Sequence, residues 1–418
     1  MGQSRELSPY RWVIEGLLIL ALLSQTLVWL APAAILPPIA KDLGISLKSG
    51  GLIISVIALF IALFSFGGAL IVENIGVLRT MLFGVWLMAV GAVLSGYVAG
   101  FGALLGCRVV EGLGFGLMIA PTGALVVEWF GEKEWPYINT VNYACSYAGI
   151  AVAFGLTTSL YSRLQSWHSA MLVYGGAVAI VALAWTVFGR ESSRVGADDE
   201  LSTDAPPAEA GGAPLGEVFG MRPVILVALA FSFAMWVFQL YTAFMPSFFV
   251  AYRGMTLEEA GRVTSILPIA GIFGAFGGGM LTTITGLRKP FLWPVMTLML
   301  LGCVGSVLSP NAALLSISLV AFGVGASAHL GAMATLVMEL PDMTPARVGA
   351  ALALVFGMGY AFAFLSPVVG GALADRFGLE AVLLGTLVLQ PVAIVSFLMV
   401  PETGPGRVAS APAIAPGA

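Results

Sequence analysis

Two ionisable residues stand three positions apart inside a long apolar stretch of the chain. Arg108 and Glu111 lie in "GCRVVEGLGFG" (106–116), and the sequence from Phe101 to Val127 is otherwise almost entirely apolar. At this spacing two side chains share one face of a helix and can form an ion pair. Pairing lowers the cost of burial, and arginine keeps donors for an anion or for backbone carbonyls. Three roles stay open: a structural clamp between helices, proton coupling through Glu111, or direct binding of an anion by Arg108.

A second titratable group, His329, lies deep in the apolar run "GASAHLGAMATLV". Imidazole titrates near neutral pH, so this side chain could bind an anion or carry a proton. The competing role is a hydrogen bond between helices. The further candidates are polar or aromatic side chains near the middle of apolar runs: Gln25, Trp29, Asn142, Tyr143, Trp236, Gln239 and Tyr360. For each of these alone, an interhelical hydrogen bond is also the alternative. Glu15, one turn from Arg11, is expected to form an interfacial ion pair with it.

The composition requires a membrane. The 418 residues are 59% hydrophobic and only 10% charged, whereas soluble domains carry about 25% charged residues. The net charge of −4 gives no indication of nucleic-acid binding. The three cysteines are isolated, and the sequence contains no metal spacing, phosphate loop or nucleophile elbow. We therefore expect no metal, no cofactor and no enzymatic activity, with a coupling proton left open.

The apolar runs predict the elements that position these residues. A helix needs about 20 apolar residues to cross the hydrocarbon core. Six such runs precede a polar interruption and six follow it. We predict an all-α polytopic membrane protein of twelve transmembrane helices in two pseudo-symmetric six-helix bundles. The predicted parts are an N-terminal bundle (1–189), a cytoplasmic linker (190–221), a C-terminal bundle (222–400) and a disordered tail (401–418). The first run, from Trp12 to Ala40, exceeds the roughly 7–15 apolar residues of a signal peptide and is expected to be retained.

The distribution of Lys and Arg predicts the orientation. With the N-terminus in the cytoplasm, eleven Lys/Arg fall on the cytoplasmic side and six on the outer side. This bias follows the positive-inside rule. An even number of spans returns the C-terminus to the same side. We expect a multi-pass protein with both termini cytoplasmic.

The two halves of the chain repeat each other and resemble a known family. A shift of about 211 residues aligns "ALVVEWFGEKEWPYINTVNY" with "TLVMELPDMTPARVGAALAL", and places Glu128 opposite Glu339. Such a repeat indicates paired bundles with a site between them. Six plus six helices around a long central loop resemble the major facilitator superfamily. The segment "CRVVEGLGFG" matches that family's fourth-helix pattern R-x-x-Q/E-G-x-G through Arg108, Glu111, Gly112 and Gly114.

The loop between the second and third helices is a degenerate copy of the family's gating pattern, G-x-L-x-D-R-x-G-R-K. In "ALIVENIGVLR", Glu73 replaces the aspartate, Gly76 is kept, and Arg79 ends the segment. A cleaner "GALADRFG" (371–378) falls on the outer face and is interpreted as a helix-end turn. "AFMPSFFVAYRGMTLEEAG" is most similar to the cyanate-permease-like branch, whose members are bacterial and associated with small anions and other small organic solutes.

The resemblance implies a monomeric transporter in the bacterial inner (plasma) membrane. It implies alternating access around a central cavity, with the lipid bilayer and a small-molecule substrate as partners. We expect uptake of a small organic or inorganic anion. The alternatives are efflux of amphipathic compounds, or a transporter-like sensor without flux. We also expect four glycines to allow close helix contact while the bundles rock: Gly112, Gly114, Gly323 and Gly325.

Overall fold

Helices make up the structure. The computed structural model describes residues 8–131, 133–192 and 215–407, and within these ranges it contains helices and loops but no strand. Twelve helical segments among the described residues are long and apolar enough to cross a membrane. The predicted fold class, an all-α polytopic protein with twelve transmembrane helices, is confirmed.

The first six spans carry the residues of the fourth-helix pattern. They are α1 (Arg11–Ala34), α3 (Leu47–Ile75), α4 (Val77–Ser95), α5 (Phe101–Trp129), α6 (Trp135–Leu164) and α7 (Trp167–Phe188). A short helix, α2 (Leu36–Leu43), follows α1 directly. Its last turn ends at Gly44, whose φ of 60° lies in the left-handed region that glycine adopts without strain.

The second six spans follow the central interruption. They are α10 (Arg222–Arg253), α11 (Leu257–Thr285), η1 with α12 (Lys289–Phe291, Trp293–Leu308), α13 (Ala312–Met338), α14 (Pro345–Phe377), and α15, η2 and α16 (Leu379–Gly385, Thr386–Leu389, Gln390–Met399). The twelfth span is interrupted by the 3-10 turn of η2, a feature that the sequence did not predict. The start of α11 is fixed by a capping box, in which Thr256 and Glu259 bond to each other's backbone amides.

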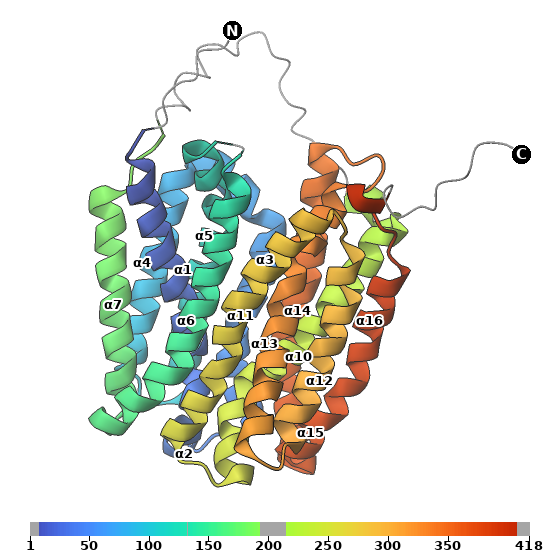
Figure 1. The fold of residues 1–418 in the computed structure, drawn as a ribbon. Coiled ribbons are helices and arrows are strands. Elements are labelled where there is room, and N and C mark those ends of the chain that lie inside the picture. The colour runs from blue at the N-terminus through green and yellow to red at the C-terminus, as the bar shows by residue number, and fades with distance from the viewer. Residues whose placement is uncertain (1–7, 132, 193–214, 408–418) are drawn as a thin grey trace, which may run out of the picture.

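The helices of the two halves lie side by side, blue to green in the first half and yellow-green to red in the second (Figure 1). Between the halves, α3 packs along α14 and α6 packs along α11. The start of α1 and η3 (Pro405–Arg407) lie at one end of the molecule, here called the η3 end. The opposite end holds α2 and is called the α2 end (Figure 1).

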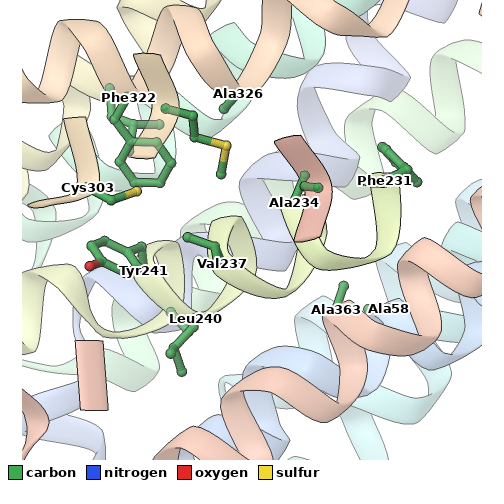
Figure 2. Close-up of a cluster of buried hydrophobic side chains, with 14 of the residues drawn as sticks. Ala58, Phe231, Ala234, Val237, Leu240, Tyr241, Cys303, Phe322, Ala326 and Ala363 are labelled. Atoms are coloured by element: carbon green, nitrogen blue, oxygen red, sulfur yellow. The ribbon is translucent and has the colours of Figure 1, made fainter. Parts of the chain in front are cut away.

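The core of the second half is built around α10. Phe231, Ala234, Val237 and Tyr241 recur at helical spacing on this helix and are buried together (Figure 2). The ring of Tyr241 meets Phe322 of α13 edge to face, at 5.5 Å between ring centroids. Its hydroxyl donates to the carbonyl oxygen of Leu383 at 2.9 Å, so the buried polar atom is satisfied.

Two segments predicted to lack structure are ordered in part. Most of the predicted linker, 193–214, lies outside the described residues, but α9 (Leu215–Phe219) is helical. The tail predicted to be disordered from residue 401 begins with a docked segment: the Glu402 carboxylate accepts hydrogen bonds from the amides of Arg288 and Lys289, both at 2.9 Å. The prediction failed for this segment because composition does not reveal a local partner. Residues 408–418 lie outside the described residues.

Candidate functional site

A cavity of about 410 Å³ lies between the two halves. Its walls come from α1, α3, α5 and α6 of the first half and from α10, α13 and α14 of the second, with one side chain from α12. The lining continues toward the η3 end, where Gly349 is exposed and the Tyr143 side chain is 45% exposed. The cavity is therefore approached from the η3 end.

The two halves touch at the α2 end. Gly51 of α3 lies against the carbonyl of Pro367 on α14, and Gly261 of α11 lies against the carbonyl of Phe154 on α6, so closely that a methyl group at either glycine would overlap the other helix. The Asp375 carboxylate of α14 also reaches the first amides of α3. These contacts close the cavity on that side.

Five of the ten residues predicted as binding or coupling candidates line this cavity. They are Gln25, Trp29, Tyr143, His329 and Tyr360. The Trp29 ring lies edge to face with Phe115, at 5.6 Å between ring centroids, and its indole N–H donates to the Ile54 carbonyl at 3.0 Å. Half of the candidates thus lie in the cavity lining, where aromatic side chains surround them, and their role in binding or coupling stays a prediction.

His329 is 2% exposed, and its two ring nitrogens differ. Nδ1 lies 3.3 Å from the carbonyl oxygen of Gly325, one turn earlier on α13. Nε2 is buried and has no partner among the described residues. A buried polar atom without a partner is costly unless a ligand or water satisfies it. His329 is thus a lining residue whose buried ring nitrogen has an unmet capacity for hydrogen bonding.

Arg108 and Glu111 are 1% exposed and are not part of the cavity lining. The Arg108 guanidinium forms an ion pair with Glu111 and donates to the carbonyl oxygens of Val28 and Trp29 on α1 (both 2.8 Å) and of Ile53 on α3 (3.0 Å). Four of its five N–H groups are used in this way. Glu111 also accepts from the Ser95 hydroxyl of α4 at 2.9 Å. The geometry joins four helices of the first half, as a clamp would.

Three other candidates lie away from the described lining. Asn142 and Gln239 are buried, and the amide atoms of both lack partners among the described residues. Trp236 donates its indole N–H to the Thr386 hydroxyl at 2.9 Å, which ties α10 to η2. Asn142 directly precedes the lining residue Tyr143 on α6, and the side chains of two consecutive helix residues cannot point in the same direction. Sequence spacing alone could not decide which of these two neighbours faces the cavity.

Glu15 has a different partner arrangement from the one expected. Arg11 pairs with Glu134, the residue before α6, at 3.0 Å rather than with Glu15. The Glu15 side chain is 4% exposed, and neither carboxylate oxygen has a partner among the residues described. The prediction was wrong because Glu134, which is distant in sequence, reaches Arg11 first.

The predicted gating loop of the first half forms a tight helix end. Gly76 adopts φ 94° between α3 and α4, and its amide donates to the Val72 carbonyl at 2.8 Å. Glu73 and Arg79 are exposed, and neither takes part in an ion pair within the described part of the chain. The gating role assigned to these three residues stays a prediction.

The equivalent loop of the second half carries an ion pair. Arg288 donates to both carboxylate oxygens of Glu339, at 2.7 and 3.0 Å, and to the Thr282 carbonyl at 2.9 Å. These hydrogen bonds raise the pKa of Arg288 and lower the pKa of Glu339. In the repeat alignment the position of Arg288 is occupied by Val77 in the first half, so the two halves are not equivalent here.

The glycines predicted to ease rocking pack within the bundles. A methyl group at Gly114 would lie 2.5 Å from the Met88 amide nitrogen of α4, and one at Gly325 would lie 2.6 Å from Cα of Met299 on α12. Gly112 and Gly323 likewise face helices of their own half. The contact between the halves instead includes five other glycines: Gly51, Gly261, Gly271, Gly357 and Gly371. Sequence could not separate the two sets because both follow the same small-residue pattern.

Comparison with known proteins gives relatives that cover part of the chain. The chain is 25% identical over 248 residues to the hexuronate transporter of Bacillus subtilis, which is 59% of this chain and 58% of that protein. It is 25% identical over 185 residues to the 4-hydroxybenzoate transporter PcaK of Pseudomonas aeruginosa, which is 44% of this chain and 41% of that protein. The chain thus spans about three fifths or less of the length of these two relatives.

A solved structure and a family model match a larger share of this chain than these two relatives do. The crystal structure of a bacterial homolog to the human lysosomal transporter Spinster, in an inward-facing and unoccupied conformation, matches with a TM-score of 0.77 at 16% identity, over 94% of this chain and 98% of that chain. This likeness concerns the fold. The family model described as the Major Facilitator Superfamily matches residues 17–342. The chain belongs to the Major Facilitator Superfamily.

Proposed function

We propose that the protein is a carrier that moves a small organic anion across a bacterial inner membrane by alternating access. The observation that carries this proposal is the central cavity, which is closed at the α2 end by contacts between the two halves and approached from the η3 end. A rocking motion that opened the α2 end and closed the η3 end would present the same lining to the other side. Residues 1–189 and 222–400 would be the two rocking bundles, joined by a linker over 190–221.

The η3 end is assigned to the cytoplasm. The Lys/Arg distribution of eleven against six supports this orientation. Both termini would then be cytoplasmic, and the structure would represent an inward-facing state. The anionic substrate is supported by the printed names of the relatives, which transport a hexuronate and 4-hydroxybenzoate. We place the chain in the cyanate-permease-like branch on its sequence motifs, and treat it as a monomer.

Within the first bundle, we propose that Arg108 and Glu111 act as the structural clamp. Three backbone carbonyls and one carboxylate already use the guanidinium, and neither residue is among those that line the cavity. Coupling through Glu111 would require this buried network to open during the cycle.

The test is ligand binding followed by flux. The purified protein would be screened by thermal shift against small organic acids and amines, because a ligand that binds the folded state stabilises it. Hits would then be tested for uptake into proteoliposomes. Accumulation of an anion is the expected result, and no flux of any stabilising anion would overturn the proposal in favour of a sensor.

A second candidate function is efflux of amphipathic compounds. The aromatic and largely apolar lining favours it, because such walls also suit uncharged lipophilic molecules. Efflux predicts that cells lacking the protein become sensitive to toxic lipophiles, whereas uptake predicts lost growth on an anion.

A further inference from the structure

We propose that the cavity takes a monocarboxylate with an apolar body of about ring size, and that the carboxylate binds together with one proton at His329. This inference rests on the proposed transport of an organic anion and names the class of anion. It follows from the charges, the free hydrogen-bonding groups and the aromatic surfaces of the described lining.

The lining can balance one negative charge at most. Among the described residues that line the cavity there is no Lys, Arg, Asp or Glu, and His329 is the one basic side chain. An anion placed in an apolar site without a compensating charge is costly. A dianion would leave one charge uncompensated here, whereas a monoanion would be matched by a single imidazolium.

Few donors in the lining remain free. Three lining hydroxyls donate hydrogen bonds to carbonyls one turn earlier on their own helices, at 2.7–3.1 Å: those of Ser65, Thr122 and Ser146. The Tyr147 hydroxyl donates to the Ala326 carbonyl of α13 at 3.1 Å. Hydrogen-bonding groups without a partner in the described structure remain on four lining residues: Gln25, Tyr143, His329 and Tyr360. This small set suits a carboxylate with one further polar group and cannot satisfy a polyhydroxylated acid.

Aromatic rings form a continuous wall around these groups. Phe231 of α10 lies edge to face with Phe356 and with Tyr360 of α14, at 5.4 and 6.4 Å between ring centroids. Tyr360 in turn lies 6.3 Å from Trp29 of α1. A flat or compact apolar body would gain burial and ring contacts against this wall. Sugar acids, whose faces carry hydroxyl groups, would gain little.

His329 lies beside the aromatic wall of the cavity. Its ring centroid is 6.4 Å from that of Phe231 and 6.2 Å from that of Phe397 on α16. The titratable side chains in the surrounding lining are Tyr143 and Tyr147 of α6 and Tyr360 of α14; α1 contributes the neutral Gln25. No charged side chain of the described lining faces the imidazole, so an imidazolium formed here needs an external counter-ion.

The proton balance follows from the two ring nitrogens. With a proton on Nδ1 directed at the Gly325 carbonyl, Nε2 is an acceptor that faces no donor in the described structure. Uptake of one proton turns Nε2 into a donor, which the incoming carboxylate accepts. One anion and one proton thus enter together, and the occupied cavity carries no net charge.

The experiment uses the full chain in detergent, with benzoate as the probe. Benzoate binding would be measured between pH 6 and pH 8 by calorimetry, with glucuronate and malonate as the polyhydroxylated and dianionic comparisons. We expect benzoate to bind and its affinity to rise by up to about tenfold per pH unit of acidification, as binding of one proton requires. We also expect uptake of one proton per bound benzoate, counted with a pH indicator in weak buffer.

Three variants separate the role of His329 from effects on folding. His329→Gln keeps a hydrogen-bonding side chain that cannot become charged, and it should lose at least tenfold in benzoate affinity at pH 6 together with the pH dependence. Tyr360→Phe should weaken binding a few-fold and retain the pH dependence. His168→Gln, at a histidine that bonds the Val98 carbonyl outside the lining, should leave both unchanged.

Several results would overturn the inference. Benzoate affinity independent of pH, or a pH dependence retained in His329→Gln, would remove the proton from the binding step. Preferential binding and transport of glucuronate or malonate would refute the substrate class while leaving the proposed anion carrier intact. Binding and flux of no anion at all would refute both proposals.

Discussion

The carboxylate of Asp375 accepts hydrogen bonds from the backbone amide of Leu47 at 3.1 Å and from that of the next residue, Lys48, at 3.2 Å. Asp375 lies in the last turn of α14 in the second half, and Leu47 begins α3 in the first half. The free amides at a helix start and the helix dipole both favour a negative charge at this position. "GALADRFG", interpreted from sequence as a helix-end turn, does end its helix at Phe377, and it also joins the two halves at the α2 end.

Asp375→Ala should shift the protein toward a state that is open at the α2 end. Loss of a helix cap costs about 0.5–2 kcal/mol, which corresponds to a change of roughly two- to thirtyfold in the population of the opened state. Thr158→Cys reports on this opening, because Thr158 is 0% exposed and lies at the contact between α6 and α11. In a background without the native cysteines, a membrane-impermeant maleimide should label this site faster in Asp375→Ala.

Glu380→Ala supplies the matched control. Glu380 is an exposed carboxylate near the start of α15 at the same end of the molecule. Its removal should leave the labelling rate unchanged. Equal labelling of Asp375→Ala and the parent protein would mean that the Asp375 contact does not hold the α2 end closed.

Gly51→Ala and Gly114→Ala should have separable effects. A methyl group at Gly51 overlaps the Pro367 carbonyl across the two halves, so Gly51→Ala should prevent closure at the α2 end, abolish flux and raise the labelling of Thr158→Cys, with the fold retained. A methyl group at Gly114 meets the backbone of α4 within the first bundle, so Gly114→Ala should instead lower thermal stability.

Gly106→Ala, on the same helix as Gly114, controls for the glycine itself. A methyl group at Gly106 has no heavy atom within 4 Å, so this variant should keep or slightly raise stability. Circular dichroism melts and proteoliposome flux read out all three variants. A loss of stability in Gly51→Ala as large as that in Gly114→Ala would contradict the assignment of Gly51 to the contact between the halves.

The fold could be predicted from sequence because its main determinant is one-dimensional. A run of about 20 apolar residues specifies a membrane helix by length and composition alone, and twelve such runs specify the fold class. The interruption of the twelfth span by η2 was missed, since Thr386 to Leu389 is as apolar as a regular helix turn.

The site could be predicted only in part, because it depends on the direction of each side chain. Gln25 and Gln239 have the same chemistry and similar depth, yet Gln25 lines the cavity and Gln239 lies outside the described lining. Tyr147 and Phe231, which form much of the wall, were not among the predicted site residues. Tyr147 follows Tyr143 by four residues on one helix face, and this spacing is the signal that could have found it.

Arg108→Ala should strongly destabilise the first bundle. It leaves Glu111 buried with only the Ser95 hydroxyl, and three carbonyls lose their donor. Removal of one partner from a buried ion pair costs about 3–5 kcal/mol. The expected results are a large drop in melting temperature and, at temperatures where the variant is folded, benzoate affinity close to that of the parent.

Glu111→Gln, which can still bond Ser95, should lose less stability. A stable Arg108→Ala protein that has lost anion binding would show that Arg108 is a ligand and would exclude the clamp.

The Arg288–Glu339 ion pair at the η3 end should make stability depend on pH. The hydrogen bonds from Arg288 lower the pKa of Glu339 in the folded protein. The pair therefore stabilises the fold above the carboxyl's ordinary pKa of about 4.3, and this stabilisation is lost as the pH falls through the lowered value. At pH 7, the free energy of unfolding of Glu339→Gln should be lower than that of the parent by on the order of 1 kcal/mol after solvent screening, so the variant should melt at a lower temperature. The two should converge at strongly acidic pH.

Glu217→Gln is the control for the Glu339 variant. Glu217 pairs with Arg347 at 3.0 Å at the same end of the molecule, but its side chain is 48% exposed. Melting in a series of buffers should give a smaller difference for this variant than for Glu339→Gln at pH 7. A difference for Glu339→Gln that persisted unchanged into strong acid would show that its effect does not come from the charge of the carboxyl.

Glu15→Met should raise stability, against the usual direction of a substitution in a core. The Glu15 carboxylate is 4% exposed and lacks partners within the described structure, while its neighbour Arg11 is held by Glu134. Burial of an unsatisfied polar group costs about 1–3 kcal/mol, and methionine fills a similar volume without that cost.

Glu134→Gln, which breaks only a partly exposed ion pair, should lower stability by no more than about 1 kcal/mol. The melting temperatures of the three proteins test the ordering Glu15→Met, parent, Glu134→Gln from most to least stable. A melting temperature of Glu15→Met below that of the parent would mean that a bound cation or water satisfies the Glu15 carboxylate. Glu15 lies on α1 two helical turns before the lining residue Leu22, so it would then be part of the approach to the cavity.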